Sequence, residues 1–233
     1  THCLSSAASD VYKRQPLLLS VRSGGRVSMP GMMDSILNIG LNDSNVSQLA
    51  EAFNDERFAL DSYRRLIQMY SNVVLGVEHE RFEAVLANKK RMDNVVSDAD
   101  FNVDQLNWII NAYKNTVERF TDSLFPQEPY EQLTGAIEAV FNSWQNKRAA
   151  TYRKINNIPD SWGTGATIQT MVFGNLNDKS GTGVAFTRNP SNGDKELYGE
   201  YLINAQGEDV VAGIRTPHPV SYTHLTLPTT SSV

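Results

Sequence analysis

Residue types suited to binding phosphate gather in one glycine-rich stretch near the start of the chain. Residues 20–35 read SVRSGGRVSMPGMMDS and contain Arg22, Arg26 and Gly31, with further glycines between the arginines. A guanidinium group offers several N–H donors in a planar fork that matches phosphate oxygens. Glycines let backbone N–H groups approach an anion closely. This combination predicts a phosphate-binding segment.

A second glycine cluster, KSGTGVAF, contains Thr182 and Gly183. We expect residues 167–175 and 181–188 to pair as a hairpin, which would place an amide-rich flap over phosphates. Neither cluster matches the P-loop pattern or the dinucleotide-binding fingerprint. Each cluster taken alone is therefore also compatible with glycines that only shape a turn.

Nucleotide chemistry also needs acidic oxygens, because magnesium bridges phosphates through oxygen ligands. The candidates are Glu200, Glu208 and Asp209, and Arg215 is a further candidate for a phosphate contact. The alternatives are a solvated loop or a turn in which the acid accepts a backbone N–H, and a surface ion pair for the arginine.

Histidine chemistry has little support in this sequence. His79 lies between Glu78 and Glu80, where we expect it to be exposed on a helix, and His218 lies between two prolines without an obvious partner. No Ser-His-Asp arrangement and no HExxH spacing occurs, so hydrolase functions are disfavoured.

The elements that must position these residues fall into a strand, helix, strand order. The apolar run at residues 17–21 predicts a buried strand, and residues 31–41 predict a short helix that ends at Gly40. Residues 45–155 are predicted to be helical. Beyond Pro159, short β-prone runs at 166–175, 181–190, 199–204 and 209–215 are separated by turn residues. The expected class is α+β with a mostly helical insertion.

The helical block shows apolar residues at three- and four-residue spacing, as a helix with one buried face requires. These positions are Phe58, Leu66, Ile67, Tyr70 and Val74; Leu106, Ile109, Ile110, Tyr113, Val117 and Phe120; and Leu133, Ile137, Val140, Phe141 and Trp144. We expect the charged residues between them to form solvated faces.

Composition narrows the class of protein. The chain has 233 residues and a formal net charge of −5, which disfavours general nucleic-acid binding. Its single cysteine, Cys3, allows no internal disulfide, which suits a reducing compartment such as the cytoplasm. No apolar run reaches the roughly 18 residues of a membrane span, and no secretory signal is evident.

The two ends have an unusual relation at the level of DNA. One codon choice for residues 10–15, DVYKRQ, has a reverse complement that encodes residues 220–225, VSYTHL, when it is extended by one base and read in a shifted frame. The shared string resembles the end of a transposon used to prepare sequencing libraries. We therefore expect residues 1–15 and 220–233 to be non-native read-through; the alternative is an ordinary polar tail.

Several long motifs resemble the pyruvate, phosphate dikinase family: LLLSVRSGGRVSMPGMMDSILNIGLND, FALDSYRRLIQMYS, FPQEP, IQTMVFGN, SGTGVAFTRNPSNG and GEYLINAQGEDVVAGIRTP. The resemblance spans nearly all of residues 16–219. It implies a partial ATP-grasp domain whose first part is residues 16–44 and whose β-rich part, with a glycine-rich flap, is residues 157–219. Residues 45–156 would be its helical insertion.

The resemblance also implies which positions contact ATP. Arg22 matches an arginine on the ATP phosphates, and Gly31 matches a glycine in a loop beside the nucleotide. The remaining matches are Gln169 and Met171 on the adenine side, Thr182 and Gly183 in the flap, and Glu208 in the GED turn.

The family reaction converts ATP, pyruvate and phosphate to AMP, phosphoenolpyruvate and pyrophosphate through a phosphohistidine on a swivelling domain. The resemblance thus implies ATP and Mg²⁺ as ligands and a homodimeric parent. The family's Asp-x-Glu metal-binding pair, its phosphoacceptor histidine and its pyruvate barrel have no counterpart in this sequence, so the fragment alone is expected to be inactive. The alternatives are a phosphoenolpyruvate synthase-like dikinase, a non-catalytic helical interaction module, and a fragment that does not fold stably.

Overall fold

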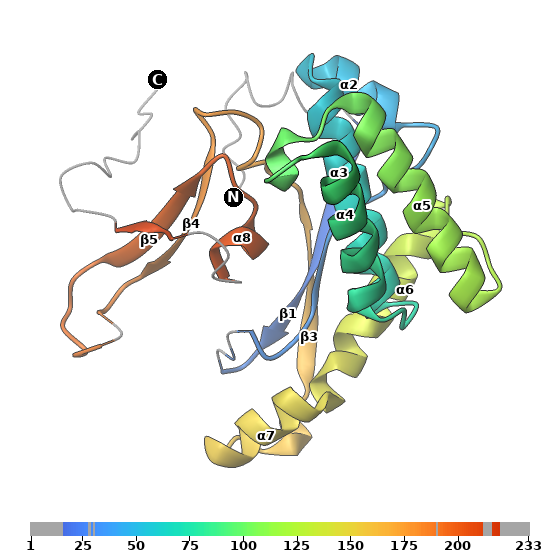
Figure 1. Cartoon of the computed structure of the whole chain (residues 1–233). Helices are drawn as coiled ribbons and strands as arrows, with labels where there is room; N and C mark the ends of the chain where they lie inside the picture. Colours follow the sequence, from blue (N-terminus) through green and yellow to red (C-terminus); the bar gives the residue numbers. More distant parts are fainter. Residues whose placement is uncertain (1–15, 28, 30, 190, 212–215, 220–233) are drawn as a thin grey trace, which may run out of the picture. The chain divides into compact units, whose positions relative to one another are not determined.

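The computed structural model of the chain describes residues 16–27, 29, 31–189, 191–211 and 216–219 (Figure 1). These residues belong to two compact units, Thr1–Met171 and Val172–Val233. The end segments 1–15 and 220–233 lie outside the described residues, as does Arg215, so the expectations about them stay predictions.

The first unit contains an antiparallel sheet with the strand order β2-β1-β3. Its strands are β1 (Leu19–Gly25), β2 (Ser35–Ile39) and β3 (Thr164–Thr170). The predicted first strand is confirmed, but it continues to Gly25 instead of ending at Val21. Arg22 and the glycines after it therefore lie within the strand and not in a loop that follows it.

The prediction of a short helix at residues 31–41 was wrong. Residues 35–39 form β2, which pairs with β1 so that Ile36 faces Val21, and both side chains are fully buried. A short apolar run does not distinguish a strand from a helix by periodicity. Here the neighbouring strand satisfies the backbone N–H and C=O groups that a helix would have bonded internally.

The helical prediction for residues 45–155 is confirmed. The helices are α2 (Val46–Phe53), α3 (Glu56–Val73), α4 (His79–Asp93), α5 (Val103–Thr121), α6 (Pro129–Asn142) and α7 (Lys147–Ile155). Short 3₁₀ helices lie at η1 (Asp98–Asp100), η2 (Ser143–Gln145) and η3 (Asp160–Trp162). Helix α5 begins with a capping box in which Asn102 and Gln105 exchange side chain to backbone hydrogen bonds.

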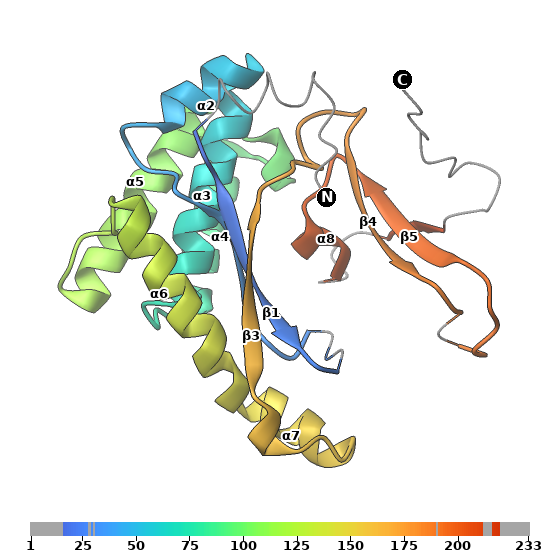
Figure 2. The ribbon, with the colours of Figure 1, turned by 180° about the vertical axis from the view of Figure 1, so that it is seen from behind.

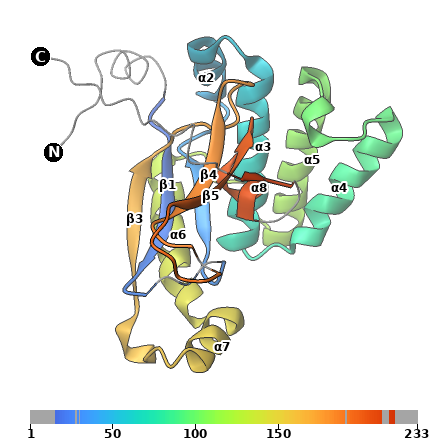
Figure 3. The same cartoon turned by 90° about the vertical axis from the view of Figure 1, so that its left-hand side faces the viewer.

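Within the first unit helices α3 to α6 lie on one face of the sheet, and α7 lies beyond one end of the strands (Figures 1 and 3). Helix α6 runs along β1 and β3, as the view from behind shows (Figure 2). Gln132 of α6 is fully buried and joins the helix to the end of β2, because its amide accepts from the Gly40 N–H (2.8 Å) and donates to the Leu41 carbonyl (3.0 Å). The sheet and the helices of this unit thus share one core.

Most of the predicted apolar faces are buried, with Phe120 and Phe141 as exposed exceptions. The expectation that charged helical residues are solvated was wrong in α3 and also in α7, where Arg153 is 2% exposed. Asp61 and Arg64 are 6% and 2% exposed, and the Arg64 Nε donates to Asp61 Oδ1 at 2.8 Å. A buried charge needs such a partner because leaving water is costly.

The second unit contains a separate antiparallel sheet with the order β4-β5-β6. Its elements are β4 (Gly181–Phe186), β5 (Tyr198–Ile203), β6 (His218–Pro219) and the short helix α8 (Gly207–Val211). The expected hairpin between residues 167–175 and 181–188 does not form, since β3 pairs with β1 whereas β4 pairs with β5.

The β-prone run at residues 209–215 also differs from its prediction in the part that is described. Residues 207–211 form α8, at whose start the Gln206 N–H donates to the Asp209 carboxylate (2.8 Å) and the Asp209 N–H donates to the Gln206 carbonyl (3.1 Å). This reciprocal capping stabilises a helical turn in a sequence rich in valine.

Across the described residues, none of the helices combines the length and the apolar character needed to cross a bilayer.

Candidate functional site

Arg22 lies within β1, where it is the last residue of the strand that pairs with β2. Its residue partners are Ser35 on β2 and Thr167 on β3. The side chain is exposed, and within the described part of the chain its guanidinium has neither an ion pair nor a hydrogen bond. Its donors are therefore free to bind an anion.

Gln169 lies on the same face of the sheet as Arg22. It pairs with Ser20, while Arg22 pairs with Thr167, and residues two apart on a strand share a face. Arg22 and Gln169 are therefore diagonal neighbours, and both are exposed. The sheet brings together two residues that are 147 positions apart in the sequence.

Met171 follows β3 and is 5% exposed. Its N–H donates to the Leu18 carbonyl (2.9 Å), which extends the pairing of β3 with the start of β1. In this unit Met171 acts as a core residue, and its predicted place beside an adenine stays a prediction.

Gly31 lies in the turn between β1 and β2. The Met32 N–H donates to the Met29 carbonyl (3.1 Å), and Gly31 has a φ of 71° at the third position of this turn. A β-turn with positive φ at that position favours glycine. An added Cβ would meet nothing within 4 Å, so the space beside Gly31 is open.

Arg26, the second arginine of the glycine-rich stretch, has a structural contact. Its guanidinium carbon lies 4.7 Å from the centroid of the Trp162 ring, within the range of a cation–π interaction. The contact holds Arg26 against η3 and leaves Arg22 as the better candidate for a phosphate.

Thr182 and Gly183 lie on β4 in the second unit. The Thr182 hydroxyl donates to the Ala205 carbonyl (2.6 Å). A Cβ at Gly183 would be 2.7 Å from the Glu200 carbonyl oxygen on β5, so glycine is required for β4 and β5 to approach. A structural role for Gly183 is thus explained by strand packing, whether or not a nucleotide lies nearby.

We expect Gly183→Ala to destabilise the β4–β5 pair by about 2 kcal/mol, as a forced shift in a packed region does. Faster amide hydrogen exchange at residues 181–186 and 198–203 would measure the effect. Gly207→Ala is the matched control, because its new Cβ would meet nothing closer than the Thr182 Cγ2 at 4.0 Å. Equal exchange in the two variants would contradict the prediction.

Two of the three acidic candidates of the second unit, Asp209 and Glu200, have partners of their own. Asp209 caps α8, and the Glu200 carboxylate accepts from the Tyr198 hydroxyl (3.3 Å), whose pKa is raised by the negative charge of Glu200. Glu208 lies in α8. No three His, Cys, Asp or Glu residues converge in the described ranges. The magnesium ligands therefore stay unassigned.

The predicted ATP positions thus fall into two groups. Arg22, Gly31, Gln169 and Met171 belong to the first unit, whereas Thr182, Gly183 and Glu208 belong to the second. Within the first unit, strand pairing places the exposed Arg22 and Gln169 on one face, and Arg22 pairs with Ser35, the first residue of β2 after the connection that contains Gly31.

Comparison with known proteins assigns this chain to a family. The family model described as "Pyruvate phosphate dikinase, AMP/ATP-binding domain" matches residues 3–231. Pyruvate, phosphate dikinase of Rhizobium meliloti (strain 1021) is 58% identical over 207 residues, which cover 89% of this chain and 23% of the relative.

Two further relatives agree with this match. Pyruvate, phosphate dikinase of Clostridium symbiosum is 56% identical over 88% of this chain and 24% of the relative. The chloroplastic enzyme of Mesembryanthemum crystallinum is 55% identical over 87% of this chain and 21% of the relative. The chain thus spans less than a quarter of the length of these relatives. It belongs to the pyruvate phosphate dikinase family and corresponds to part of the family's AMP/ATP-binding domain.

Proposed function

We propose that this chain binds the phosphates of ATP and serves as part of the nucleotide site of a pyruvate, phosphate dikinase. The observation that carries the proposal is Arg22, whose exposed guanidinium has no protein partner in the described residues and lies on the face that also carries Gln169. The match to an AMP/ATP-binding domain supports a nucleotide over other phosphate ligands.

The chemistry assigned to the first unit is charge neutralisation and orientation. Phosphoryl transfer relies mainly on positioning and electrostatic stabilisation. Arg22 would bind phosphate oxygens with its guanidinium fork, and the open turn at Gly31 would let a phosphate approach the backbone. Gln169 and Met171 would lie toward the adenine, and Thr182, Gly183 and Glu208 stay predicted ATP contacts on the basis of the family match.

The complete reaction would need parts of the relatives that this chain does not match. We therefore expect the purified chain to bind Mg-ATP but to form no phosphoenolpyruvate from pyruvate, ATP and phosphate. Isothermal titration calorimetry measures the first outcome, and a coupled phosphoenolpyruvate assay measures the second.

The control is a complete relative, such as the Rhizobium meliloti enzyme, assayed under the same conditions. Absence of Mg-ATP binding by a folded chain would contradict the proposed nucleotide site. Formation of phosphoenolpyruvate by the chain alone would show that the proposed division of the reaction among domains is wrong.

A further inference from the structure

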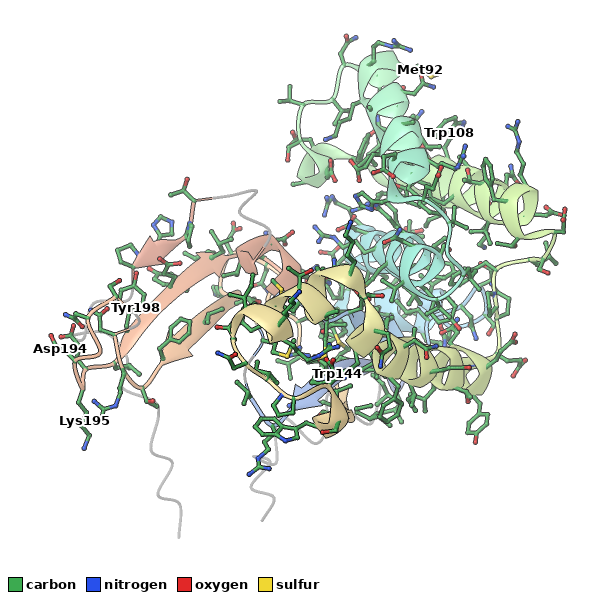
Figure 4. The ribbon with its side chains drawn as sticks, turned by 90° about the horizontal axis from the view of Figure 1, so that it is seen from below. Met92, Trp108, Trp144, Asp194, Lys195 and Tyr198 are labelled. Carbon is green, nitrogen blue, oxygen red and sulfur yellow. The ribbon has the colours of Figure 1, made fainter. Side chains whose placement is uncertain are left out.

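The turn that contains Gly31 is held at both ends by residues far away in the sequence. At its start, Met29 is 7% exposed and packs against Trp144 and Ala149. Figure 4 shows Trp144 between the yellow helical segment and the blue ribbon of the first strands. Met32 and Met33 contact the same cluster from beyond the turn. The apolar side chains thus attach the turn to η2 and α7.

Arg148 of α7 binds the other end of the turn. Its Nε donates to the Met32 carbonyl (3.1 Å), and its Nη2 forms an ion pair with the Asp34 carboxylate. One planar guanidinium therefore binds a backbone carbonyl and a side-chain carboxylate that lie two residues apart. Such two-pronged binding fixes geometry as well as charge.

Asp34 has two further partners on the same helical segment. Its second carboxylate oxygen accepts from the Asn146 amide (2.9 Å), and its N–H donates to the Ser143 hydroxyl (3.3 Å). The next residue, Ser35, pairs with Arg22 across the strands. The contacts of Asp34 therefore fix the chain directly beside Arg22.

We propose that Arg148 is a positioning residue for nucleotide phosphate binding: by holding Met32 and Asp34, it keeps the Met29–Met32 turn and the neighbouring Arg22 in the geometry that receives a phosphate. This inference rests on the proposed function. Arg148 itself does not touch the ligand and acts through the turn.

The physical reason is the entropy of the turn. A glycine at positive φ gains much conformational freedom when the turn is released. A phosphate that binds a released turn must order it again, which lowers the affinity. Holding the turn in advance removes that cost.

Two backbone amides report directly on this arrangement. The Met32 N–H donates a hydrogen bond inside the turn and the Asp34 N–H donates to Ser143, so the hydrogen exchange of these two amides measures opening at each end of the turn.

In Arg148→Ala we expect both amides to exchange about tenfold faster. The dissociation constant for Mg-ATP should rise about fivefold, within the range of one lost charged hydrogen bond. The melting temperature should change little, because a surface ion pair adds little to global stability.

Lys147→Ala is the matched control. Lys147 precedes Arg148 in the first turn of α7, but in the described residues its ammonium has no ion-pair partner. It should leave exchange and affinity unchanged. Arg148→Lys should show the same fast exchange and weak Mg-ATP binding as Arg148→Ala. The reason is that an ammonium binds at a single point and does not reproduce the planar fork.

The outcomes separate the two proposals. If Arg148→Ala leaves the exchange of Met32 and Asp34 unchanged, the inference is overturned. It is also overturned if exchange rises while the Mg-ATP affinity stays the same, or if lysine restores both readouts. If the unmodified chain binds no Mg-ATP, the proposed function fails, and the exchange data still decide whether Arg148 holds the turn.

Discussion

Replacing Arg22 by alanine is expected to lower the rate of a complete dikinase that contains this sequence by roughly 100- to 1000-fold, equal to about 2.7–4 kcal/mol, the usual loss for one transition-state donor. The reason is that Arg26 and Arg148, the arginines that contact Trp162 and the Gly31 turn, are already engaged: Arg26 stacks on Trp162 and Arg148 binds Asp34. The steady-state rate of phosphoenolpyruvate formation measures the loss.

The same substitution in the isolated chain should weaken Mg-ATP binding without changing the melting temperature, because the Arg22 side chain is exposed and makes no hydrogen bond or ion pair within the described residues. Arg91→Ala is the control, since it removes an equal charge from an exposed site on α4. Unchanged nucleotide binding in Arg22→Ala would instead favour the alternative of a helical interaction module that binds no nucleotide.

The second large effect is expected in α3, where Arg64→Ala should lower the free energy of unfolding by about 3–5 kcal/mol, because it leaves a buried carboxylate with too few partners. Arg64 also donates to Gln68 (3.1 Å), and Arg65 donates to the second oxygen of Asp61 (3.1 Å). Arg65→Ala is the graded control and should cost less, because the Arg65 side chain is 19% exposed. Urea denaturation followed by tryptophan fluorescence measures both, since the tryptophans lie in the first unit.

A pH series distinguishes this ion pair from a simple packing loss. Burial by itself would raise the pKa of Asp61, but the charges of Arg64 and Arg65 outweigh it and hold the pKa at about 2, below the ordinary 3.8. A lowered pKa contributes stability that is present above the unfolded value and is lost as pH falls through the folded value. We expect the unmodified chain to lose about 2 kcal/mol between about pH 5 and pH 2 from this group.

In Arg64→Ala this part of the acid sensitivity should shrink, because the charge that favours the Asp61 carboxylate is gone. An unchanged pH profile in the variant would mean that other carboxylates account for acid unfolding. Stability of Arg64→Ala equal to that of the unmodified chain at pH 7 would contradict the role assigned to the buried pair.

The helical block shows how far periodicity alone can predict structure. The repeated spacing of residues such as Leu106, Ile110 and Tyr113 predicts α5, because a 3.6-residue period places them on one buried face. The same pattern did not reveal Arg64, since a charged residue inside a helical sequence is exposed far more often than buried. Only the packing of α3 against α5 encloses its guanidinium.

The β-rich parts were harder to predict, because strand pairing joins distant residues. Residues 35–39 carry a short apolar run that fits a helix or a strand, and β1 decides for the strand. Likewise, the sequence does not state whether residues 164–170 pair with 181–186 or with 19–25. The structure selects the second pairing, and this choice brings Gln169 beside Arg22.

The sequence by itself determined the α+β class, the helical block, the family, and the choice of Arg22 and the glycines as phosphate-binding candidates, because residue types and long motifs carry that information locally. The tertiary structure decided which strands pair, that Arg22 stays exposed while Arg26 stacks on Trp162, that Gly183 is required by the approach of β5, and that Arg148 holds the turn at Gly31. These outcomes depend on contacts between residues at least 12 positions apart. Such contacts are settled by packing and by the pairing of backbone groups, and no local pattern of residues specifies them.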